Sequence, residues 1–568
     1  MSRAAPGRHV RQGRLVFACV SWAVSLAAFC LPFANPDLFW HLSAAKRILA
    51  IHAVPRQDWL SWSMGGRPWV DFEWLTQIVW FALFRAGGMR GLLALKALLF
   101  LGASLAFWKT LKTYGIGLAG RSLGLLAWTA SLAPSNDLRP ENFSLLFFSL
   151  EWLVLERRRL GRFSPGAWGR PAGAALFALW ANLHPGFAYG LALLGVFAAA
   201  EIFRRRSWDL AWTGFWCALG ALANPFGWNL YGVILEHARS MEDLQSHILE
   251  WGAPSVLNPW MAAFWVLLAA AFAAVLWRHV RSRDVPAEHW ICLSFFALSA
   301  AAHARAIPYF CMVGAPVAAL HLHRLAGNGG GPWKAATGST AAALLGFYVF
   351  WFGKQPPFLR AFLPKFIPDR VASFLKAEEP AFGEKRMLNP WEWGGYLGYT
   401  LAPACKVFVD GRYIFHPFLR PMSEAERSPE AYQAFLQREG IDVVVQKRFH
   451  QFFLTPIELP GGEKLDLPRP YYVSFLPASR WALVYWSAQG LVFARRGAFP
   501  PDWIRGHEFK YFRPDDLTVA AVLLKKGEAR PGAVREEVRR FERLNDGYPE
   551  AREAGLWEAA FVPGGARP

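Results

Sequence analysis

The sequence predicts a mainly α-helical, polytopic membrane protein in which about eleven transmembrane spans precede an α/β domain outside the membrane. Apolar residues make up 54% and aromatic residues 16% of the 568 residues, a composition unlike that of an average soluble protein. Charged residues make up only 18% and gather between long apolar runs. From about residue 354 the runs stop, and a mixed polar sequence continues to the end.

The formal net charge is +19, a value that can indicate nucleic-acid binding. Many of the basic residues, however, lie in short loops between apolar runs, where an excess of Lys and Arg marks the cytoplasmic side. This placement argues against a nucleic-acid partner. Five of the six cysteines fall in apolar runs and only Cys405 lies in the polar part, so neither a disulfide framework nor a zinc ligand pair is expected.

The N-terminal apolar run, residues 15–33, follows a stretch that contains four arginines. A secretory signal peptide is one interpretation of this pattern. The run is long, however, and residues 32–34 (Pro-Phe-Ala) make a poor cleavage site. These features favour an uncleaved first span whose basic end is cytoplasmic, so that the loop after it faces outward.

The later runs can be placed alternately across the membrane so that every strongly basic loop lies on the cytoplasmic side. The expected spans are 15–33, 92–108, 122–133, 143–155, 172–183, 187–203, 210–223, 260–277, 290–302, 307–320 and 340–352. Residues 75–84 are too few to span and are expected to form an interfacial or partly embedded helix. A miscount between 75 and 108 would invert all later loops, and the agreement of those loops argues against it.

Three parts are expected along the chain. Residues 1–353 form the transmembrane module with its first external loop at 34–74, residues 354–500 an extracytoplasmic α/β domain, and residues 501–568 a helical, partly flexible tail. Within the last two parts, the patterns predict helices at 370–377, 430–439 and 535–544, buried strands at 406–410 and 442–446, and a hairpin of 481–485 with 491–495.

The first external loop is unusually rich in ionisable side chains for a segment that follows a membrane span. These are Asp37, His41, Lys46, Arg47, Asp58, Arg67, Asp71 and Glu73. Residues 37–51 have helical periodicity and are expected to lie on the membrane surface. Asp37 would then stand in the first turn, where a carboxylate also simply stabilises the helix end.

Further polar groups fall at the outer ends of other expected spans: Asp137, Arg139 and Glu141; Asn182 and His184; and His303 and Arg305. Such a lining suits the binding of an anionic phosphate while a carboxylate removes a proton from a hydroxyl. Each group also has a structural interpretation. Arg139 and Glu141 can form an ion pair, His184 can close the turn before Pro185, and Arg305 requires some anionic partner, for which phosphate is well suited.

The first external loop resembles that of the GT-C superfamily of lipid-phosphosugar-dependent membrane glycosyltransferases, including the aminoarabinose and protein-mannosyl transferase branches. Asp37 matches the acidic residue that opens their surface helix, residues 57–59 (Gln-Asp-Trp) match a Gly-Asp-Trp segment, and residues 66–69 and 72–75 match the return to the membrane. The Lys-Pro-Pro that follows the glutamate in that pattern is absent here, and Asp71 is additional. A phosphate contact must then come from Arg67, Arg139 or Arg305.

The chain also resembles a family of bacterial membrane proteins that begin with D-x-F-W-H-L and carry N-x-x-W-G-G-Y-L and V-F-x-D-G-R in an outer domain. The matching residues here are Asp37, 39–42, Asn389, 393–397 and 407–412. Aromatic side chains at 391–396 could stack on sugars, although a place in the domain core is the simpler interpretation.

These resemblances imply an inverting transferase of the bacterial inner membrane. The donor would be a polyprenyl-phosphate sugar and the acceptor a lipid, glycan or protein hydroxyl on the outer face. Asp37 would be the general base, with Asp71 and Glu73 as further catalytic candidates. The donor phosphate and substrate would contact residues among His41, Lys46, Arg47, Arg67, Arg139, Glu141, His184 and Arg305.

A divalent metal, Mg²⁺ or Mn²⁺, is compatible with the resemblance because some branches use one, but no ligand spacing in the sequence requires it. Two other functions fit a polytopic chain. A transporter or flippase of a lipid-linked glycan would predict charges at mid-membrane depth and broken helices in repeated halves, whereas the charges here gather at one face. A non-catalytic assembly protein would leave the acidic loop without a purpose.

Overall fold

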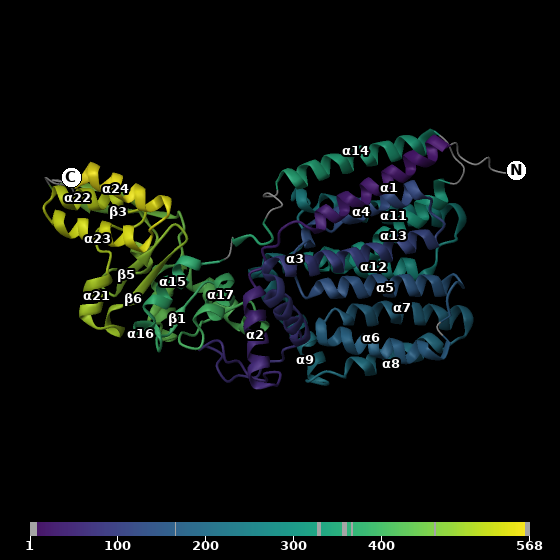
Figure 1. Cartoon of the computed structure of the whole chain (residues 1–568), viewed down its shortest axis with the longest axis horizontal. Coiled ribbons are helices and arrows are strands. Elements are labelled where there is room, and N and C mark those ends of the chain that lie inside the picture. Colours follow the sequence, from purple (N-terminus) through teal and green to yellow (C-terminus); the bar gives the residue numbers. More distant parts are fainter. Residues whose placement is uncertain are drawn as a thin grey trace. The chain divides into compact units, whose positions relative to one another are not determined.

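The computed structural model describes residues 8–164, 166–326, 331–354, 360–364, 367–458 and 462–562. The chain forms two compact units (Figure 1). Unit 1 comprises Met1–Asn35, Ala44–Val54 and Val70–Lys365, and unit 2 comprises Pro36–Ser43, Pro55–Trp69 and Phe366–Pro568. The first external loop is therefore shared between the units, and its helix α2 (Leu38–Ile51) begins in unit 2 and ends in unit 1.

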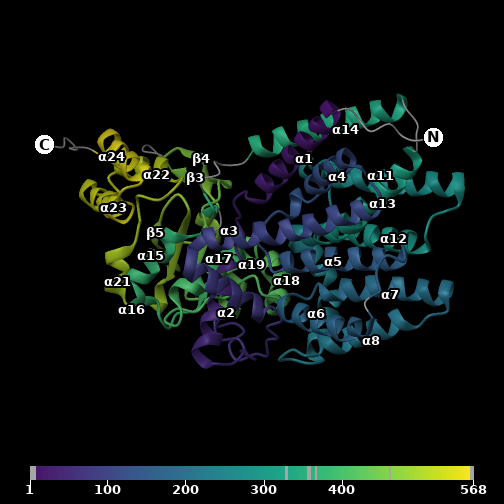
Figure 2. The same ribbon diagram turned by 45° about the vertical axis from the view of Figure 1, so that its right-hand side comes forward.

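Unit 1 is a bundle of helices that run side by side (Figure 1, Figure 2). Long apolar runs adopt this form because a helix satisfies its own backbone polar groups inside a bilayer. Helix α6 packs against α8, α3 against α5, and α11 against α13. The helices are α1 (Arg8–Phe29), α3 (Trp74–Thr113), α4 (Leu118–Ser131), α5 (Glu141–Arg159), α6 (Gly169–Leu183), α7 (Phe187–Arg205), α8 (Asp209–Ala221), α9 (Asn229–Arg239), α10 (Met241–His247), α11 (Ala262–Ser282), α12 (Ala287–Ala302), α13 (Ile307–Ala326) and α14 (Gly331–Gly353).

Among the described residues, five segments are long and apolar enough to cross a membrane. They are Arg11–Phe29, Trp74–Thr113, Phe187–Arg205, Pro259–Ser282 and Ala304–Leu325, and two shorter apolar helices, Ala287–Ala302 and Ser339–Gly353, accompany them. The predicted multi-pass, mainly helical fold is confirmed. The count of eleven spans stays a prediction, since helices such as α4 and α8 have only 14 and 13 residues.

Helix α3 bends at Gly88, whose φ of 58° and ψ of −147° are not helical. Glycine adopts a positive φ without steric cost, which explains why the bend falls at this residue. The part after the bend, residues 89–113, is about 37 Å long at ~1.5 Å per residue, enough to cross a bilayer core of about 30 Å. The interfacial placement of residues 75–84 stays a prediction.

Lys96 is a fully buried cation in the second part of α3. Its ammonium group donates to the carbonyl oxygen of Leu31 at 2.8 Å and to that of Asn136 at 3.3 Å. Nearby, the side-chain amide of Asn35 donates to the carbonyl oxygen of Leu138 at 2.8 Å. These bonds fix the chain that leaves α1 against the loop that precedes α5.

Asp137 strengthens the same attachment. Its Oδ1 accepts the backbone N–H of Ala34 at 3.0 Å and that of Leu138 at 2.7 Å. Burial raises the pKa of Asp137, while the charges of Arg139 and Lys96 oppose the rise. Asp137 therefore has a structural task, which is to hold the entrance of the first external loop.

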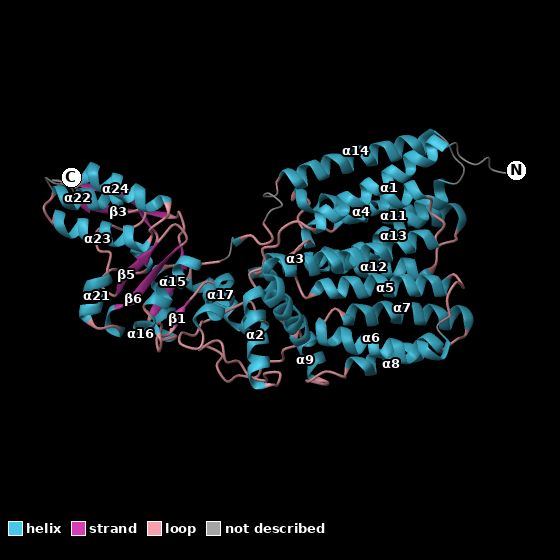
Figure 3. Ribbon diagram, in the orientation of Figure 1, coloured by secondary structure: helices cyan, strands magenta, loops and turns pink. Residues whose placement is uncertain are grey.

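Unit 2 contains all the named strands in the described part of the chain (Figure 3). A four-stranded sheet has the order β1 (Met387–Leu388), β2 (Val443–Lys447), β6 (Gly490–Arg495) and β5 (Trp481–Trp486), with only the β1–β2 pair parallel. A separate ribbon pairs β3 (Phe452–Glu458) with β4 (Lys464–Pro470). The helices are α15 (Asp369–Ala377), α16 (Glu379–Phe382), α17 (Trp391–Leu401), α18 (His416–Ala425), α19 (Pro429–Arg438), α20 (Tyr472–Phe475), α21 (Pro501–His507), α22 (Leu517–Lys525), α23 (Pro531–Leu544) and α24 (Pro549–Phe561).

The predicted strand at 442–446, the hairpin and the helices at 370–377, 430–439 and 535–544 are confirmed. Every residue of β5 is buried, and so is nearly all of β2 and β6. This burial accounts for their largely apolar sequences. Residues 391–396 begin α17, and Trp393 lies in the domain core, as the simpler interpretation of this segment predicted.

The predicted strand at 406–410 is wrong, since only Val407 makes an isolated bridge, to Ser61. The side chain of Asn389 occupies the backbone groups that a neighbouring strand would use. It accepts the N–H of Phe408 at 2.7 Å and donates to the carbonyl oxygen of Val409 at 2.9 Å. Side-chain bonding of this kind competes directly with a sheet ladder.

Candidate functional site

Several predicted polar residues gather where helices of unit 1 begin or end. Glu73 precedes α3, Glu141 opens α5 and His184 follows α6. Trp74 connects the start of α3 to the end of α6, because its indole N–H donates to Asn182 Oδ1 at 2.7 Å. Burial raises the pKa of Glu141, and the charges of Arg305 and Arg139 oppose this rise. We name Glu73, Arg139, Glu141, His184 and Arg305 the helix-end cluster.

His184 has a defined tautomer. Its Nδ1 accepts the backbone N–H of Gly186 at 3.0 Å and lies 2.8 Å from the hydroxyl oxygen of Ser144. Burial, with a smaller effect of Arg305, lowers the pKa of His184 to about 3, so the ring is neutral at pH 7. Since Nδ1 accepts, the proton is on Nε2, which lies 3.9 Å from Glu73 Oε1. His184 thus presents an uncharged N–H donor beside a carboxylate.

Arg305 lies in a short turn, Ala304–Ala306, just before α13. It is half-buried, and its guanidinium lies over the ring of Trp251, 5.0 Å from the centroid. No carboxylate of the described chain comes within ion-pairing distance of it. Its charge contributes to lowering the pKa of His184, of His237 and of His303, in each case after burial. The charge of Arg305 therefore acts on several titratable groups around this cluster, including the carboxylates of Glu141 and Glu250.

Arg139 differs, because both of its terminal nitrogens donate to the carboxylate of Glu250. Burial alone would raise the pKa of Glu250, but the charge and hydrogen bonds of Arg139 lower it to about 2. The ion pair predicted for Arg139 exists, although its partner is Glu250 rather than Glu141. Sequence proximity suggested Glu141, whereas the fold brings a residue from the loop before α11.

Asp71 is buried and accepts a hydrogen bond from the side-chain amide of Gln77 at 2.5 Å. This bond attaches the segment before α3 to the first turns of that helix. The geometry supports a structural role for Asp71. Glu73 is the better candidate for proton transfer, because its carboxylate faces the ring of His184.

A second polar centre lies entirely within unit 2 and is built around Arg412. This guanidinium is 2% exposed and stands 2.7 Å from Asp58 Oδ1 and 2.8 Å from Asp410 Oδ2. It also lies 5.0–5.8 Å from the ring centroids of three aromatic side chains, Trp59, Trp69 and Phe415. Burial raises the pKa of Asp410, and Arg412 opposes that rise. We name Asp58, Asp410 and Arg412 the buried ion triad.

The triad places Gly411 directly against Asp37. A Cβ on Gly411 would collide with the Asp37 carboxylate and would stand 3.2 Å from Trp40 Nε1. Gly395 of α17 approaches the same turn, since its Cβ would lie 3.2 Å from the carbonyl oxygen of Pro36. The start of α2 therefore packs on glycines of the two motifs from the outer domain, W-G-G-Y-L and D-G-R.

The other residues predicted to contact the donor or substrate belong neither to the helix-end cluster nor to the buried ion triad. His41 is buried and stacks on Trp40 with a centroid distance of 3.6 Å. Lys46 and Arg47 are exposed on α2, and Arg67 is exposed in the segment Pro55–Trp69. His41, Asp37 and Arg67 belong to unit 2, whereas Lys46, Arg47 and the helix-end cluster belong to unit 1.

Within the ranges described above, no three His, Cys, Asp or Glu side chains are arranged to hold a metal ion. The carboxylates that could serve have other partners: Asp58 and Asp410 bind Arg412, Glu250 binds Arg139, and Asp71 binds Gln77. These residues do not fit a divalent cation.

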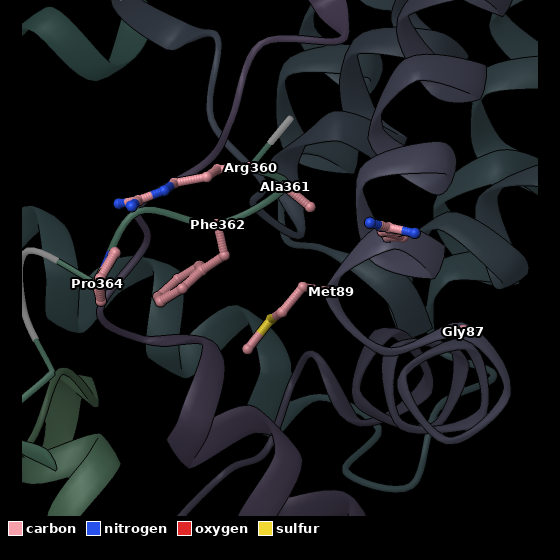
Figure 4. A pocket seen from close by; sticks show the side chains of 7 residues that line it. Gly87, Met89, Arg360, Ala361, Phe362 and Pro364 are labelled. Carbon is pink, nitrogen blue, oxygen red and sulfur yellow. The ribbon is translucent and has the colours of Figure 1, made fainter. Parts of the chain in front are cut away.

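A cavity of about 460 Å³ opens beside the bend in α3. Figure 4 shows Met89 and Phe362 opposite one another in it, with the guanidinium of Arg360 pointing away from Met89. The remaining lining is Gly87, Arg90, Ala361 and Pro364. None of these residues belongs to the helix-end cluster.

Two features escaped the sequence analysis. Asp58 and Arg412 were visible in separate motifs, but nothing in the sequence showed that residues so far apart form an ion pair. The second feature is a pair of fully buried histidines, His289 and His321, whose Nδ1 and Nε2 atoms lie 3.0 Å apart.

No family model and no curated protein matches the sequence. Solved structures do match. The archaeal oligosaccharyltransferase AglB from Archaeoglobus fulgidus, in complex with an inhibitory peptide and a dolichol-phosphate, has 11% sequence identity, covers 96% of this chain and 87% of its own, and gives a TM-score of 0.58.

ArnT from Cupriavidus metallidurans bound to undecaprenyl phosphate has 14% identity, with 84% of this chain and 97% of that chain covered and a TM-score of 0.46. The arabinofuranosyltransferase AftD from Mycobacteria has 15% identity, with 87% and 42% covered and a TM-score of 0.45. The likeness to AglB extends over nearly the whole chain and includes both units. The chain therefore shares the fold of AglB, in agreement with the resemblance to the GT-C superfamily.

Proposed function

We propose that the chain is an integral-membrane glycosyltransferase that moves a sugar from a polyprenyl-phosphate donor to a lipid, glycan or protein hydroxyl. We place this reaction at the outer face of the bacterial inner membrane, with the N-terminus cytoplasmic and the domain of unit 2 outside. The observation that carries the proposal is Arg305, a half-buried cation in the helix-end cluster that forms no salt bridge among the described residues. The GT-C fold supports it.

A phosphate is the ligand that best completes the helix-end cluster. Arg305 offers a planar array of N–H donors that matches phosphate oxygens, and Trp251 holds its guanidinium from one face. His184 adds a neutral Nε2–H donor, which binds an anion without requiring a proton from solvent. Donors fixed before the reaction stabilise the negative charge that develops on a departing polyprenyl phosphate.

The remaining step is removal of a proton from the acceptor hydroxyl. We propose that the Asp37 carboxylate takes this proton as the acceptor oxygen forms its bond to the anomeric carbon. The bond from that carbon to the phosphate oxygen breaks at the same time, and the phosphate leaves with the electron pair, so the anomeric configuration inverts. Support comes from the superfamily position that Asp37 matches and from its tight packing on Gly411.

Glu73 is the alternative base, because it lies in the helix-end cluster and faces His184. Asp71 is a weaker candidate, since Gln77 already occupies one of its oxygens. The two proposals differ in which single substitution abolishes transfer.

The test is glycosyl transfer by purified protein in detergent with a panel of polyprenyl-phosphate sugars. Wild type should transfer with at least one donor, Asp37→Asn should lose transfer while remaining folded, and Glu73→Gln should retain most of it. The reverse pattern would make Glu73 the base. Sugar transfer that persists in Arg305→Gln with unchanged donor affinity would refute the proposed phosphate contact.

A second candidate function, translocation of a lipid-linked glycan, is favoured by one observation. Glu151 lies ten residues beyond Glu141 in α5, about 15 Å further along the helix at ~1.5 Å per residue, and hence near the middle of a bilayer about 30 Å thick. Glu151 is an exception to the gathering of charged residues at one membrane face that the sequence suggests. Movement of a lipid-linked glycan across proteoliposomes without sugar transfer would establish the second function in place of the first.

A further inference from the structure

Glu151 is a carboxyl group inside the membrane bundle for which the described structure supplies no hydrogen-bond or ionic partner. Its residue is 8% exposed, and neither carboxyl oxygen meets a donor. An ionised carboxylate in such surroundings would lose its hydration without compensation. A neutral carboxylic acid avoids most of that cost.

The groups that the described structure brings close to Glu151 carry no positive charge. On α7, Gly190 leaves room for the carboxyl group, since a Cβ there would stand 2.8 Å from Glu151 Oε2 and 2.7 Å from the ring of Trp180. The titratable groups that face it are the thiols of Cys217 on α8 and Cys292 on α12. Neither thiol can supply a positive charge.

Glu156, five residues further along α5, shows what an ionised carboxylate needs in this bundle. It is also fully buried, but it receives two bonds from Arg159, each 2.7 Å long, and lies 3.2 Å from His289 Nε2. Two other buried glutamates of unit 1 follow the same rule: Glu201 pairs with Arg158 and Glu288 with Arg204. Glu141 has no such pair, but it lies near the charges of Arg305 and Arg139. Glu151 departs from this rule.

We infer that Glu151 is a proton-binding site in the middle of the bundle, held as a neutral carboxylic acid at pH 7. This inference goes beyond the proposed sugar transfer and does not depend on it. Its chemical ligand is the proton. A second consequence is selective reactivity toward a hydrophobic carbodiimide, which attacks protonated carboxyl groups in apolar surroundings.

The labelling reaction conserves all atoms. The Glu151 O–H adds across one C=N bond of dicyclohexylcarbodiimide, so that the proton goes to nitrogen and the carboxyl oxygen bonds to the central carbon. The acyl group then moves to a nitrogen of the same adduct and gives a stable N-acylurea. The product carries the mass of one whole reagent molecule.

The first measurement is the infrared spectrum of the full chain in detergent at pH 8, where an exposed glutamate with an ordinary pKa near ~4.3 is ionised. The difference spectrum of wild type minus Glu151→Gln should contain the carbonyl band of a protonated carboxylic acid. Glu156→Gln is the matched control, and its difference spectrum should lack that band. A Glu151→Gln difference spectrum without the band would overturn the inference.

The second measurement maps the carbodiimide adduct by mass spectrometry of the digested protein. We expect the adduct on the peptide that contains Glu151, at least tenfold above any adduct on Glu156, and none at this position in Glu151→Gln. Equal labelling of Glu151 and Glu156 would contradict the inference. Thermal unfolding gives a readout independent of reagent access: Glu151→Gln should leave Tm unchanged, and a marked fall would show that an ionised carboxylate is required.

Discussion

Arg412 in unit 2 and Arg305 in unit 1 are both sheltered arginines that lie against aromatic rings, but their charge balance is opposite. Arg412 is 2% exposed and meets two carboxylates, Asp58 and Asp410. Arg305 is half-buried over Trp251 and forms no salt bridge to a carboxylate in the described part of the chain. An arginine whose charge is already neutralised holds a fold together, whereas one whose charge is not neutralised can take an anion from outside.

The largest effect should come from breaking the buried ion triad. Arg412→Ala leaves two carboxylates buried without a counter-ion, a change that typically costs about 3–5 kcal/mol of unfolding free energy. We expect a large fall in Tm, or failure to accumulate folded protein, measured by thermal unfolding in detergent. Arg495→Gln is the control, because the exposed Arg495–Asp442 pair should contribute no more than about 1 kcal/mol. Equal effects of the two substitutions would contradict the distinction.

Arg305→Gln should separate activity from stability. Loss of one preorganised donor to a developing anion typically lowers kcat about 10²- to 10³-fold. We expect a decrease of that size in sugar transfer with little change in Tm, because Arg305 forms no salt bridge in the described part and Glu141 keeps the charge of Arg139 nearby. Arg305→Lys should recover part of the rate, since it restores the charge but not the planar donors. A stability loss as large as that of Arg412→Ala would place both arginines in the same structural class.

Gly411→Ala tests whether the triad also positions Asp37. The added Cβ collides with the Asp37 carboxylate, and overpacking of this kind typically costs about 1–3 kcal/mol. Transfer should fall as well. Gly497→Ala is the matched control in unit 2, because a Cβ there meets nothing within 4 Å. In a double-mutant cycle, Asp37→Ala should restore stability to Gly411→Ala; additive losses would instead show that the two residues are uncoupled.

The smallest expected effect concerns pH. Burial lowers the pKa of His184 to about 3, below its ordinary value of 6.5, so the folded state keeps the ring neutral. Unfolded chains bind this proton below about pH 6.5, and wild type should therefore lose stability relative to His184→Gln as pH falls from 6.5 toward 3. Tm measured from pH 4 to 8 checks this. Donor affinity should stay flat between pH 6 and 8; a step near 6.5 would show that His184 titrates.

Much of the fold and part of the site followed from local patterns. Apolar runs and loop charges predicted a multi-pass bundle with a polar end, and Glu73, Glu141 and His184 do lie at helix ends in one unit. Short apolar runs and helical patterns also located β5, β6 and α23. These features depend on residues close together in the sequence, so the sequence carries the information directly.

What the sequence could not predict depends on distant partners. Asp58 and Arg412 pair across more than 300 residues, and Glu250 rather than Glu141 neutralises Arg139. The strand expected at 406–410 failed because one side chain, that of Asn389, occupied its backbone groups. The outer segment between α8 and α11 was expected to be a loop but contains α9 and α10, because short amphipathic helices resemble polar linkers.

The hydrogen bonds of Lys96 have a consequence for synthesis at the membrane. Its acceptor at Leu31 is made before the lysine, but its acceptor at Asn136 lies 40 residues after it. A translating ribosome thus delivers a charged span whose binding pocket is only half built, and such a charge costs about 2.5–3.5 kcal/mol on insertion scales. The translocation machinery must accordingly shield this segment until α4 and the loop after it emerge. The order of the chain therefore determines when Lys96 can form both of its hydrogen bonds and this part of the bundle can pack.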